Sequence, residues 1–547
     1  MLAQPNAVLD LASHFARRGR GMHQVYNQHA KRLKSGAMHR ISRSTIWVVI
    51  LLVGSLMPTL VVSIPAMVDY PNHLARMHIL AAVGTPAENP FYTVRWSAYP
   101  NLAMDVIVPW LARVMSVEAA TKLFLLVSQL LIVSGAVVFE WTVKKRHQLS
   151  GYAALVVLYS LPFAWGFLNF QFTLGLALWG LAAAERLNAS RWPVRLAVHT
   201  LFVVVLFFGH LFALGLYAAT LGLLELSRLS RATSPEVATR VVLLGLPVVA
   251  VLAATHIAGG TVGNGTTEWE LASKLRSVFR GLNGYNAELA AICAAALIMA
   301  IYMLFRSGVL TLSPTGRWVA GGLVLLFLAM PYRLFGTAYV DVRVLVAAVL
   351  IVPAFVFVDP HRSRWSARAA GALATVVIVV NATVSGAVWI GYQSEYKNLT
   401  TSFRLLGTSA RVLVASSRDG EDLLELPMHH APTLAVSANA FVPSLYAFPG
   451  MQPIEAASQV AHLRIEDIRY LAPVPFQILQ KTVAGTSESA VPLFVRQWVR
   501  EFDFVYLVGP RVADPVPGVL QEIAAGNRFV LYRINSTGIA TPLQPPR

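Results

Sequence analysis

The sequence predicts a polytopic α-helical membrane protein that carries a small C-terminal α/β domain outside the membrane. Of its 547 residues, 56% are hydrophobic and only 13% are charged, whereas soluble globular proteins carry about 25% charged residues. Apolar runs near the length of a bilayer crossing recur along most of the chain. In the last part of the chain, shorter strand-like and helical stretches replace these long runs.

The charge is strongly positive but unevenly placed. The formal net charge is +17, and the surplus lies in the first 44 residues and in short segments between apolar runs. Lys and Arg in short loops mark the cytoplasmic side of membrane proteins. We therefore interpret the charge as topology and expect no nucleic-acid partner. The short basic segments are Lys144–Arg146, Arg186 with Arg191, Arg228 with Arg231, and Arg362–Arg364.

Run length and composition predict about eleven transmembrane helices. An odd number of spans after a cytoplasmic N-terminus puts the C-terminus outside, and the basic segments then all fall inside. Because the count of spans does not use charge, this agreement supports the topology independently. The predicted spans lie near 45–66, 119–142, 151–168, 170–186, 194–210, 211–227, 241–258, 286–305, 318–332, 344–358 and 370–391.

This topology divides the chain into three parts. Residues 1–44 form a basic cytoplasmic tail, residues 45–392 the transmembrane domain, and residues 393–547 an extracytoplasmic soluble domain. The tail is too long before the first apolar run to be a cleaved signal peptide. The first extracytoplasmic loop, 66–118, contains a segment from Asn101 to Met115 that is apolar on one face. We expect that segment to lie on the membrane surface as a helix.

The soluble domain is predicted to mix strands with helices, in a small α/β or α+β arrangement. Its strand-like and helical stretches alternate along the sequence, without an internal repeat or a low-complexity linker. The predicted strands are Arg411–Ala415, Phe502–Val508 and Arg528–Arg533, and the predicted helices are Glu455–Leu471 and Leu493–Glu501.

The segment from Asp69 to Arg76 concentrates reactive side chains directly after the first predicted span. Pro71 suits the first position of a helix, which would place Asp69 at the cap and His73 and Arg76 on one face. One interpretation is structural: Asp69 caps the helix, and His73 and Arg76 are solvated at the membrane surface. The other interpretation is a catalytic site at that surface.

The stretch Asp69-Tyr70-Pro71-Asn72-His73 resembles a motif of the C-type (GT-C) membrane glycosyltransferases, whose first long extracytoplasmic loop begins with an acidic residue. The layout is similar too, with many spans, amphipathic helices in that loop and a C-terminal extracytoplasmic domain. Gly166–Phe170 and Pro331–Arg333 also resemble segments of uncharacterised bacterial members. The resemblance covers the chain up to the soluble domain.

The resemblance implies a glycosyltransferase in which Asp69 is the catalytic base and His73 a second catalytic residue. The donor would be a polyprenyl-phosphate sugar, and the acceptor a lipid, a glycan or a protein. Many members carry a second acidic residue where Tyr70 stands here. No metal ligand is therefore assigned, and the need for a divalent metal stays open.

A lipid-phosphate donor also requires cations that hold the departing phosphate, and Arg does so best through forked hydrogen bonds. Arg343 has a structural alternative as an interfacial anchor paired with Asp341. Lys274, Arg276 and Arg280, on the second outer loop, are weaker candidates and are expected to be solvated. The arginines predicted to face outside and bind substrate are Arg76, Arg333 and Arg343.

Two polar residues, His210 and Asn169, fall at predicted outer turns. Polar side chains at membrane depth are often functional. At a wet turn, however, a histidine or an amide needs no functional explanation. Both residues are therefore candidates for substrate binding, with a purely structural role as the alternative.

Two other functions stay open beside the leading one. A transporter or lipid flippase places ionisable residues within its helices and often has paired halves, whereas most charges here lie at helix ends. A non-catalytic scaffold would tolerate the loss of Asp69. No Walker loop, His-Glu-x-x-His or Gly-x-Ser-x-Gly motif is present. The leading hypothesis is a glycosyltransferase of the inner (plasma) membrane, with a cytoplasmic N-terminus and a periplasmic or extracellular C-terminal domain.

Overall fold

The computed structural model divides the chain into two compact units, Met1–Ile50 and Leu51–Arg547. In the first unit the described residues belong to the beginning of helix α2 (Arg43–Val61), so nearly all of the predicted cytoplasmic tail lies outside them. The residues that the structure describes are 43–145, 150–228, 233–257, 266–334, 336–359, 361–417, 426–447, 452–463, 473–486, 491–512 and 516–535.

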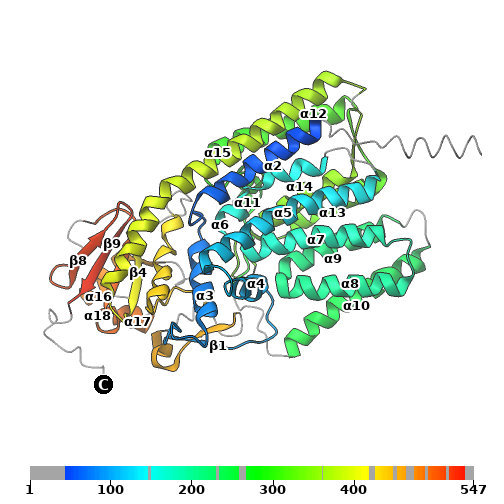
Figure 1. Cartoon of the computed structure of the whole chain (residues 1–547). Helices are drawn as coiled ribbons and strands as arrows, with labels where there is room; N and C mark the ends of the chain where they lie inside the picture. Colours follow the sequence, from blue (N-terminus) through cyan, green and yellow to red (C-terminus); the bar gives the residue numbers. More distant parts are fainter. Residues whose placement is uncertain are drawn as a thin grey trace, which may run out of the picture. The chain divides into compact units, whose positions relative to one another are not determined.

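Long apolar helices make up the larger part of the second unit. Figure 1 shows α5, α7, α8 and α9 packed side by side. Within the described residues, five helices are long and apolar enough to cross a membrane, and three more are apolar but shorter. The chain is thus a mostly helical integral membrane protein, while the count of about eleven spans stays a prediction. The five long helices are α5 (Val117–Lys144), α8 (Trp192–Gly209), α10 (Ser234–Ile257), α12 (Ala287–Arg306) and α15 (Arg364–Ser402), and the three shorter ones are α2, α9 (Leu211–Leu226) and α13 (Pro314–Ala329). Two further helices are α7 (Leu168–Arg186) and α14 (Val340–Ile351).

The segment 151–168 is predicted to be one transmembrane helix, and this prediction is wrong. The segment folds as a 3-10 helix, Ser150–Val157, followed by the five-residue helix α6 (Leu161–Trp165). Pro162 lies in the first turn of α6, and Gly166 ends it in a left-handed conformation with φ +88°. Glycine adopts that conformation without steric cost, so the chain reverses there before α7 begins.

The predicted span 344–358 is also shorter than expected. Helix α14 ends at Ile351, and the chain turns through a 3-10 segment that contains Pro353. Proline cannot donate the backbone hydrogen bond that a continuing helix needs. The residues after it form strand β3 (Val356–Val358), which pairs with β2 (Leu310–Leu312).

Shorter helices gather at the end of the bundle where α7 begins. They are α3 (Tyr70–Ala82), α4 (Ala103–Leu111) and α11 (Leu271–Arg280). Helix α4 confirms the helix predicted within Asn101–Met115: Asp105 on its inner face is buried, while Trp110 on the outer face is 65% exposed. An exposed apolar face on a short helix of a membrane protein is typical of contact with lipid at the bilayer surface.

The C-terminal part contains a five-stranded sheet in the order β6-β4-β7-β9-β8. Strand β4 pairs in parallel with β7 and β6, and β9 pairs antiparallel with β7 and β8. The three predicted strands are confirmed as β4, β7 and β9, with small shifts at their ends. The strands are β4 (Val412–Ser416), β6 (Val474–Pro475), β7 (Phe504–Val508), β8 (Leu520–Ala525) and β9 (Phe529–Ile534).

The two predicted helices of this part differ from the structure. The segment predicted as Glu455–Leu471 begins instead in strand β5 (Ile454–Ala456), which pairs antiparallel with β1 (Tyr92–Val94) of the first long loop. A 3-10 helix follows, and the rest of that prediction lies outside the described residues. The predicted helix Leu493–Glu501 is present as two one-turn helices that meet at Gln497.

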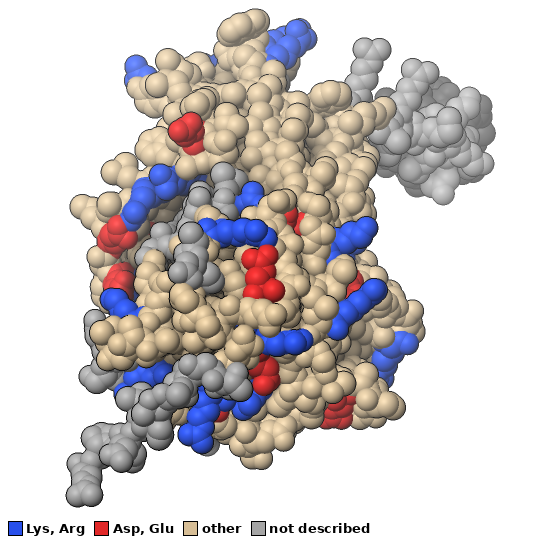
Figure 2. Space-filling view, turned by 90° about the vertical axis from the view of Figure 1, so that its left-hand side faces the viewer, with Lys and Arg blue, Asp and Glu red and all other residues tan. Residues whose placement is uncertain are grey.

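Helix α15 joins the bundle to the sheet. It continues past the predicted domain boundary to Ser402, and Glu395 on it accepts hydrogen bonds from the backbone of Asn527 and Arg528 in the β8–β9 turn. Figure 2 looks at the side of the molecule that bears the sheet, where Lys, Arg, Asp and Glu gather on the lower half. Above them the surface is mostly uncharged, as expected for helices in contact with lipid.

Candidate functional site

Asp69 lies at the start of α3, where the chain enters the first long loop. Its backbone N–H donates to the carbonyl of Trp165 at 2.9 Å, so the turn after α6 fixes its position. Asp69 is the N-cap residue of α3, as predicted, but its side chain accepts no capping hydrogen bond. The structural interpretation of this carboxylate, as a helix cap, is therefore wrong.

The turn at Gly166 packs directly against Asp69. A β-carbon on Gly166 would lie 3.1 Å from the backbone nitrogens of Asp69 and Tyr70. A β-carbon at that distance would push the backbone of Asp69 back by a few tenths of an ångström, and the positive φ of Gly166 favours glycine as well. The segment Gly166–Phe170, singled out in the sequence by its resemblance, thus supports the predicted base.

The carboxylate of Asp69 instead faces residues from far along the chain. The Tyr446 hydroxyl donates to Asp69 Oδ1 at 2.7 Å, and His430 Nε2 lies 3.7 Å from the same oxygen. Asn72, one turn along α3, bonds to the same segment through Ser444. Sequence reasoning missed Tyr446 and His430, because no local pattern connects them to Asp69. The adjacent pair His429-His430 in an apolar stretch was the one available signal.

Arg343 belongs to the same cluster and does not pair with Asp341. Its guanidinium lies over the ring of Phe167 at 4.1 Å from the centroid, with two more phenylalanine rings within 6 Å. One guanidinium nitrogen, Nη2, donates to the carbonyl of Ala338 at 3.3 Å, and buried Nε has no hydrogen-bond partner among the described residues. Asp341 instead binds Lys274 and Ser273, so the interfacial-anchor interpretation of Arg343 fails.

The expectation that Lys274 is solvated is also wrong. Its ammonium donates to the carbonyls of Phe327 and Met330 near the end of α13, and it lies 3.4 Å from Asp341 at the start of α14. The end of one helix prefers a cation and the start of the next prefers an anion. Lys274 therefore holds α11, α13 and α14 together beside the cluster and is not available to substrate.

Burial determines the charge states of the cluster. It raises the pKa of Asp69 to about 7, although the hydrogen bond from Tyr446 and the charge of Arg343 both lower it. Burial lowers the pKa of His73 well below its usual range, and the nearby Arg76 and His430 lower it further. Near neutral pH, Asp69 is thus poised to take up or release a proton, whereas His73 is uncharged.

Arg76 has a partner inside the protein. Its Nε lies 2.7 Å from Asp105 Oδ1 and its Nη2 donates to Oδ2 at 3.0 Å, with both side chains 1% exposed. The expectation that Arg76 and His73 are solvated is wrong, since both are buried. Arg76 therefore joins α3 to α4. Because its guanidinium is paired with Asp105, nothing in the structure supports the predicted phosphate-binding role.

Asn169 and His210 both hold backbone in place. Asn169 accepts from the backbone N–H of Met104 and donates to the carbonyl of Asn101, which fixes the start of α4. His210 Nδ1 accepts from the N–H of Phe212 and caps α9. His210 is nonetheless close enough to Arg343 for that charge, after burial, to lower its pKa, which is about 3.

Arg333 lies in a different environment. It makes an ion pair with Glu268 at 3.4 Å and donates to the carbonyl of Gly336. Within the described residues no contact joins Arg333 to Asp69. The sequence-based topology puts Asp69, His73, Arg333 and Arg343 all at outer helix ends; Arg333 lies apart from the cluster that contains the other three.

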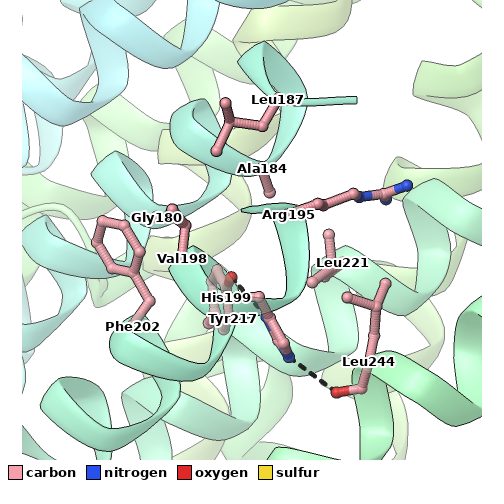
Figure 3. Close-up of a pocket in the computed structure, with 10 residues that line it drawn as sticks. All are labelled: Gly180, Ala184, Leu187, Arg195, Val198, His199, Phe202, Tyr217, Leu221 and Leu244. Carbon is pink, nitrogen blue, oxygen red and sulfur yellow. Dashed lines mark hydrogen bonds between the residues drawn. The ribbon is translucent and has the colours of Figure 1, made fainter. Parts of the chain in front are cut away.

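A small cavity lies elsewhere, among α7, α8, α9 and α10. Figure 3 shows His199 inside it, bonded to the Tyr217 hydroxyl at 3.0 Å and to the Leu244 carbonyl at 2.8 Å. Arg195, on the cavity wall, makes an ion pair with buried Glu225. The polar groups of His199 are thus already used by the protein, and the cavity has the character of helix packing rather than of a binding site.

No cluster of three or more His, Cys, Asp or Glu side chains that could hold a metal ion occurs among the described residues. Asp69 and His430 lie near one another but do not form such a set.

Comparison with known proteins gives limited information. No protein-family model matches the chain, and no curated protein matches its sequence. Two solved structures of ArnT from Cupriavidus metallidurans are similar to it: one bound to undecaprenyl phosphate, with 11% identity and a TM-score of 0.47, and one in the apo state, with 13% identity and a TM-score of 0.46. Each match covers 92% of this chain and 100% of that chain. At these values the likeness assigns neither a family nor an activity.

Proposed function

We propose that this chain is a GT-C type membrane glycosyltransferase, which transfers a sugar from a polyprenyl-phosphate donor to an acceptor at the outer face of the inner (plasma) membrane. The observation that carries the proposal is that Asp69 and Arg343 lie in one buried cluster, close enough for each charge to act on the other. The carboxylate accepts a hydrogen bond at Oδ1 alone, and the guanidinium keeps a buried Nε without a partner among the described residues.

These two groups fit the two ends of a glycosyl transfer. Asp69 takes the proton of an acceptor hydroxyl as the acceptor oxygen forms a bond to the anomeric carbon of the sugar. The bond from that carbon to the phosphate oxygen breaks, and the electron pair leaves with the lipid phosphate. Arg343 stabilises that departing anion by a charge-assisted hydrogen bond in a site that excludes water.

The pKa of Asp69 suits this role. A general base works best when its pKa lies near the working pH, and burial raises the pKa of Asp69 to about 7. An exposed aspartate would be ionised but too weak a base. The same carboxylate would be an expensive group to bury in a protein that made no use of it.

The lipid part of the donor gives a reason for the location. A polyprenyl chain stays in the bilayer, so its phosphate can be reached only at the membrane surface. Helix α4, with its exposed Trp110, places a lipid-facing helix next to α3.

The test is sugar transfer by purified protein in liposomes that contain a polyprenyl-phosphate sugar labelled in the sugar. We expect the wild-type chain to move label to an acceptor, and Asp69→Asn to move none. Asp359→Asn is the matched control, because Asp359 is exposed near an unrelated helix start. Equal transfer by Asp69→Asn and the control would overturn the proposal. Transport of intact donor across the bilayer without sugar transfer would favour a flippase instead.

A further inference from the structure

The segment after α15 contributes an ordered chain of hydrogen bonds to the Asp69 site. The chain begins at Asn72, which is fully buried. Asn72 Oδ1 accepts from the backbone N–H of Tyr446 at 2.8 Å, and Nδ2 donates to the carbonyl of Ser444 at 2.8 Å. A backbone N–H can only donate and a carbonyl can only accept, so these two contacts fix the orientation of the amide.

The fixed amide in turn fixes the tautomer of His430. Asn72 Nδ2 lies 3.4 Å from His430 Nδ1 and has only hydrogens to offer, so Nδ1 is the acceptor. Burial, followed by the effect of the neighbouring His429, lowers the pKa of His430 to about 3, so the ring is neutral and carries one proton. That proton must lie on Nε2.

With its proton on Nε2, His430 sets the direction of the two hydrogen bonds that lead to Asp69. His430 Nε2 lies 3.3 Å from the Tyr446 hydroxyl oxygen, to which it donates. The hydroxyl then uses its own hydrogen for Asp69 Oδ1, at 2.7 Å. Burial raises the pKa of Tyr446 well above its usual range, so the hydroxyl keeps its proton. Each donor is thus oriented by the one before it, and all of them point at the carboxylate.

We propose that Asn72, His430 and Tyr446 are positioning residues whose one-directional hydrogen-bond chain stabilises the carboxylate form of Asp69 and leaves Oδ2 for the acceptor hydroxyl. The proposal rests on the proposed function, in which Asp69 is the base. It assigns to the C-terminal part of the chain a role in catalysis, because two of the three residues come from the segment that follows α15.

The sign of the expected pH effect follows from this geometry. Besides Tyr446, three titratable side chains face Asp69. Arg343 from α14 is charged, whereas His73 from α3 and His430 are uncharged. Substitutions of Tyr446 or His430 leave Arg343 in place. Loss of the Tyr446 hydroxyl removes an interaction that favours ionised Asp69, so the pKa of Asp69 rises above about 7. A base must be ionised to work, so the acidic limb of the activity profile moves to higher pH.

The experiment compares pH–rate profiles of kcat/KM for sugar transfer by wild type, Tyr446→Phe and His430→Phe. For Tyr446→Phe we expect the acidic limb to move up by about one pH unit, with about tenfold lower activity below the limb and a much smaller loss above pH 9. His430→Phe keeps a ring of similar shape and should move the limb in the same direction by less. It also provides the test if Tyr446→Phe does not fold.

Tyr506→Phe is the matched control. It too removes a buried tyrosine hydroxyl, which bonds to Ser402 in the sheet region, away from Asp69. Its profile should keep the wild-type limb even if its melting temperature falls. If Tyr446→Phe and His430→Phe both keep the wild-type acidic limb while Asp69→Asn is inactive, the positioning role of the hydrogen-bond chain is overturned and the proposed function stands. A wild-type protein without transfer activity would overturn the proposed function itself, and this inference with it.

Discussion

Arg343 and Asp69 lie in one buried cluster although 274 residues separate them in sequence (343 − 69), and the charge of Arg343 acts on the carboxylate. Aromatic rings surround the guanidinium on several sides, so little water screens that charge. A planar cation is thus held among aromatic rings near a carboxylate whose pKa is raised by burial to about 7.

Asp69→Asn is expected to abolish transfer while folding and membrane insertion stay intact. Asn keeps the size of Asp and can still occupy a helix N-cap, but it cannot take a proton. General-base catalysis is worth about 10² to 10⁴-fold in rate. Transfer would be followed in membranes with the protein level checked by blot. Near-normal transfer by a well-expressed variant would mean that the base lies elsewhere.

Arg343→Lys is expected to impair transfer nearly as much as Arg343→Ala. Lysine keeps the charge but loses both the planar contact with Phe167 and the forked donors that match a phosphate. The loss should appear in the KM for the donor and in kcat, with the KM for the acceptor little changed. Arg276→Lys, at an exposed arginine paired with Glu270, is the control. A mild Lys variant would show that charge alone matters.

Arg76→Ala is expected to destabilise the protein by about 3 to 5 kcal/mol, because it leaves Asp105 buried without its cation. The double variant Arg76→Ala, Asp105→Ala should recover part of that loss, since neither charge remains. Thermal unfolding in detergent measures both. If Arg76 instead binds donor phosphate, the single variant would melt near the wild-type temperature and fail only in transfer.

Gly166→Ala is expected to disturb the site beyond the cost of its backbone conformation. Gly407→Ala is matched to it: both glycines have positive φ, but nothing lies within 4 Å of a β-carbon at Gly407, whereas one at Gly166 meets the backbone of Asp69. Each substitution should cost about 1 kcal/mol or more in stability through the strained φ. Only Gly166→Ala should also reduce transfer, and equal activity of the two variants would argue against the contact.

The predicted topology places the N-terminus in the cytoplasm and everything after about Gln393 outside. Reporter fusions after Lys145 and after Gln393 should therefore report opposite sides of the membrane. If both fusions report the same side, the predicted topology is wrong, and the site can no longer be assigned to the outer face.

Local rules predicted the parts of the site that lie close together in sequence. The start of α3 near Pro71, with Asp69 at its cap position, follows from helix-start preferences. The same rules failed for side-chain partners. The structural alternative for Arg343 paired it with Asp341, but Asp341 lies beside Lys274 from α11, which also binds carbonyls at the end of α13.

Contacts between residues far apart in sequence account for the parts of the site that the sequence did not predict. The hydrogen bond between Tyr446 and Asp69 spans 377 residues, and no periodicity within one segment encodes it. The end of α6 at Gly166 also involves a contact with a distant part of the chain. Glycine within an apolar run is common in membrane helices, so the sequence alone did not show that this glycine takes a left-handed conformation against the backbone of Asp69.

The hydrogen bond from Tyr446 to Asp69 also sets a time at which the site can exist. Ribosomes add about 5 to 20 residues per second, so the 377 residues between the two partners take about 20 to 75 s to synthesise. Throughout that interval α3 is already made while its carboxylate lacks the hydroxyl that holds it. A chain released early or cut after α15 would insert in the membrane with an incomplete site. The proposed site is therefore complete only after the segment around Tyr446 has been translated and folded.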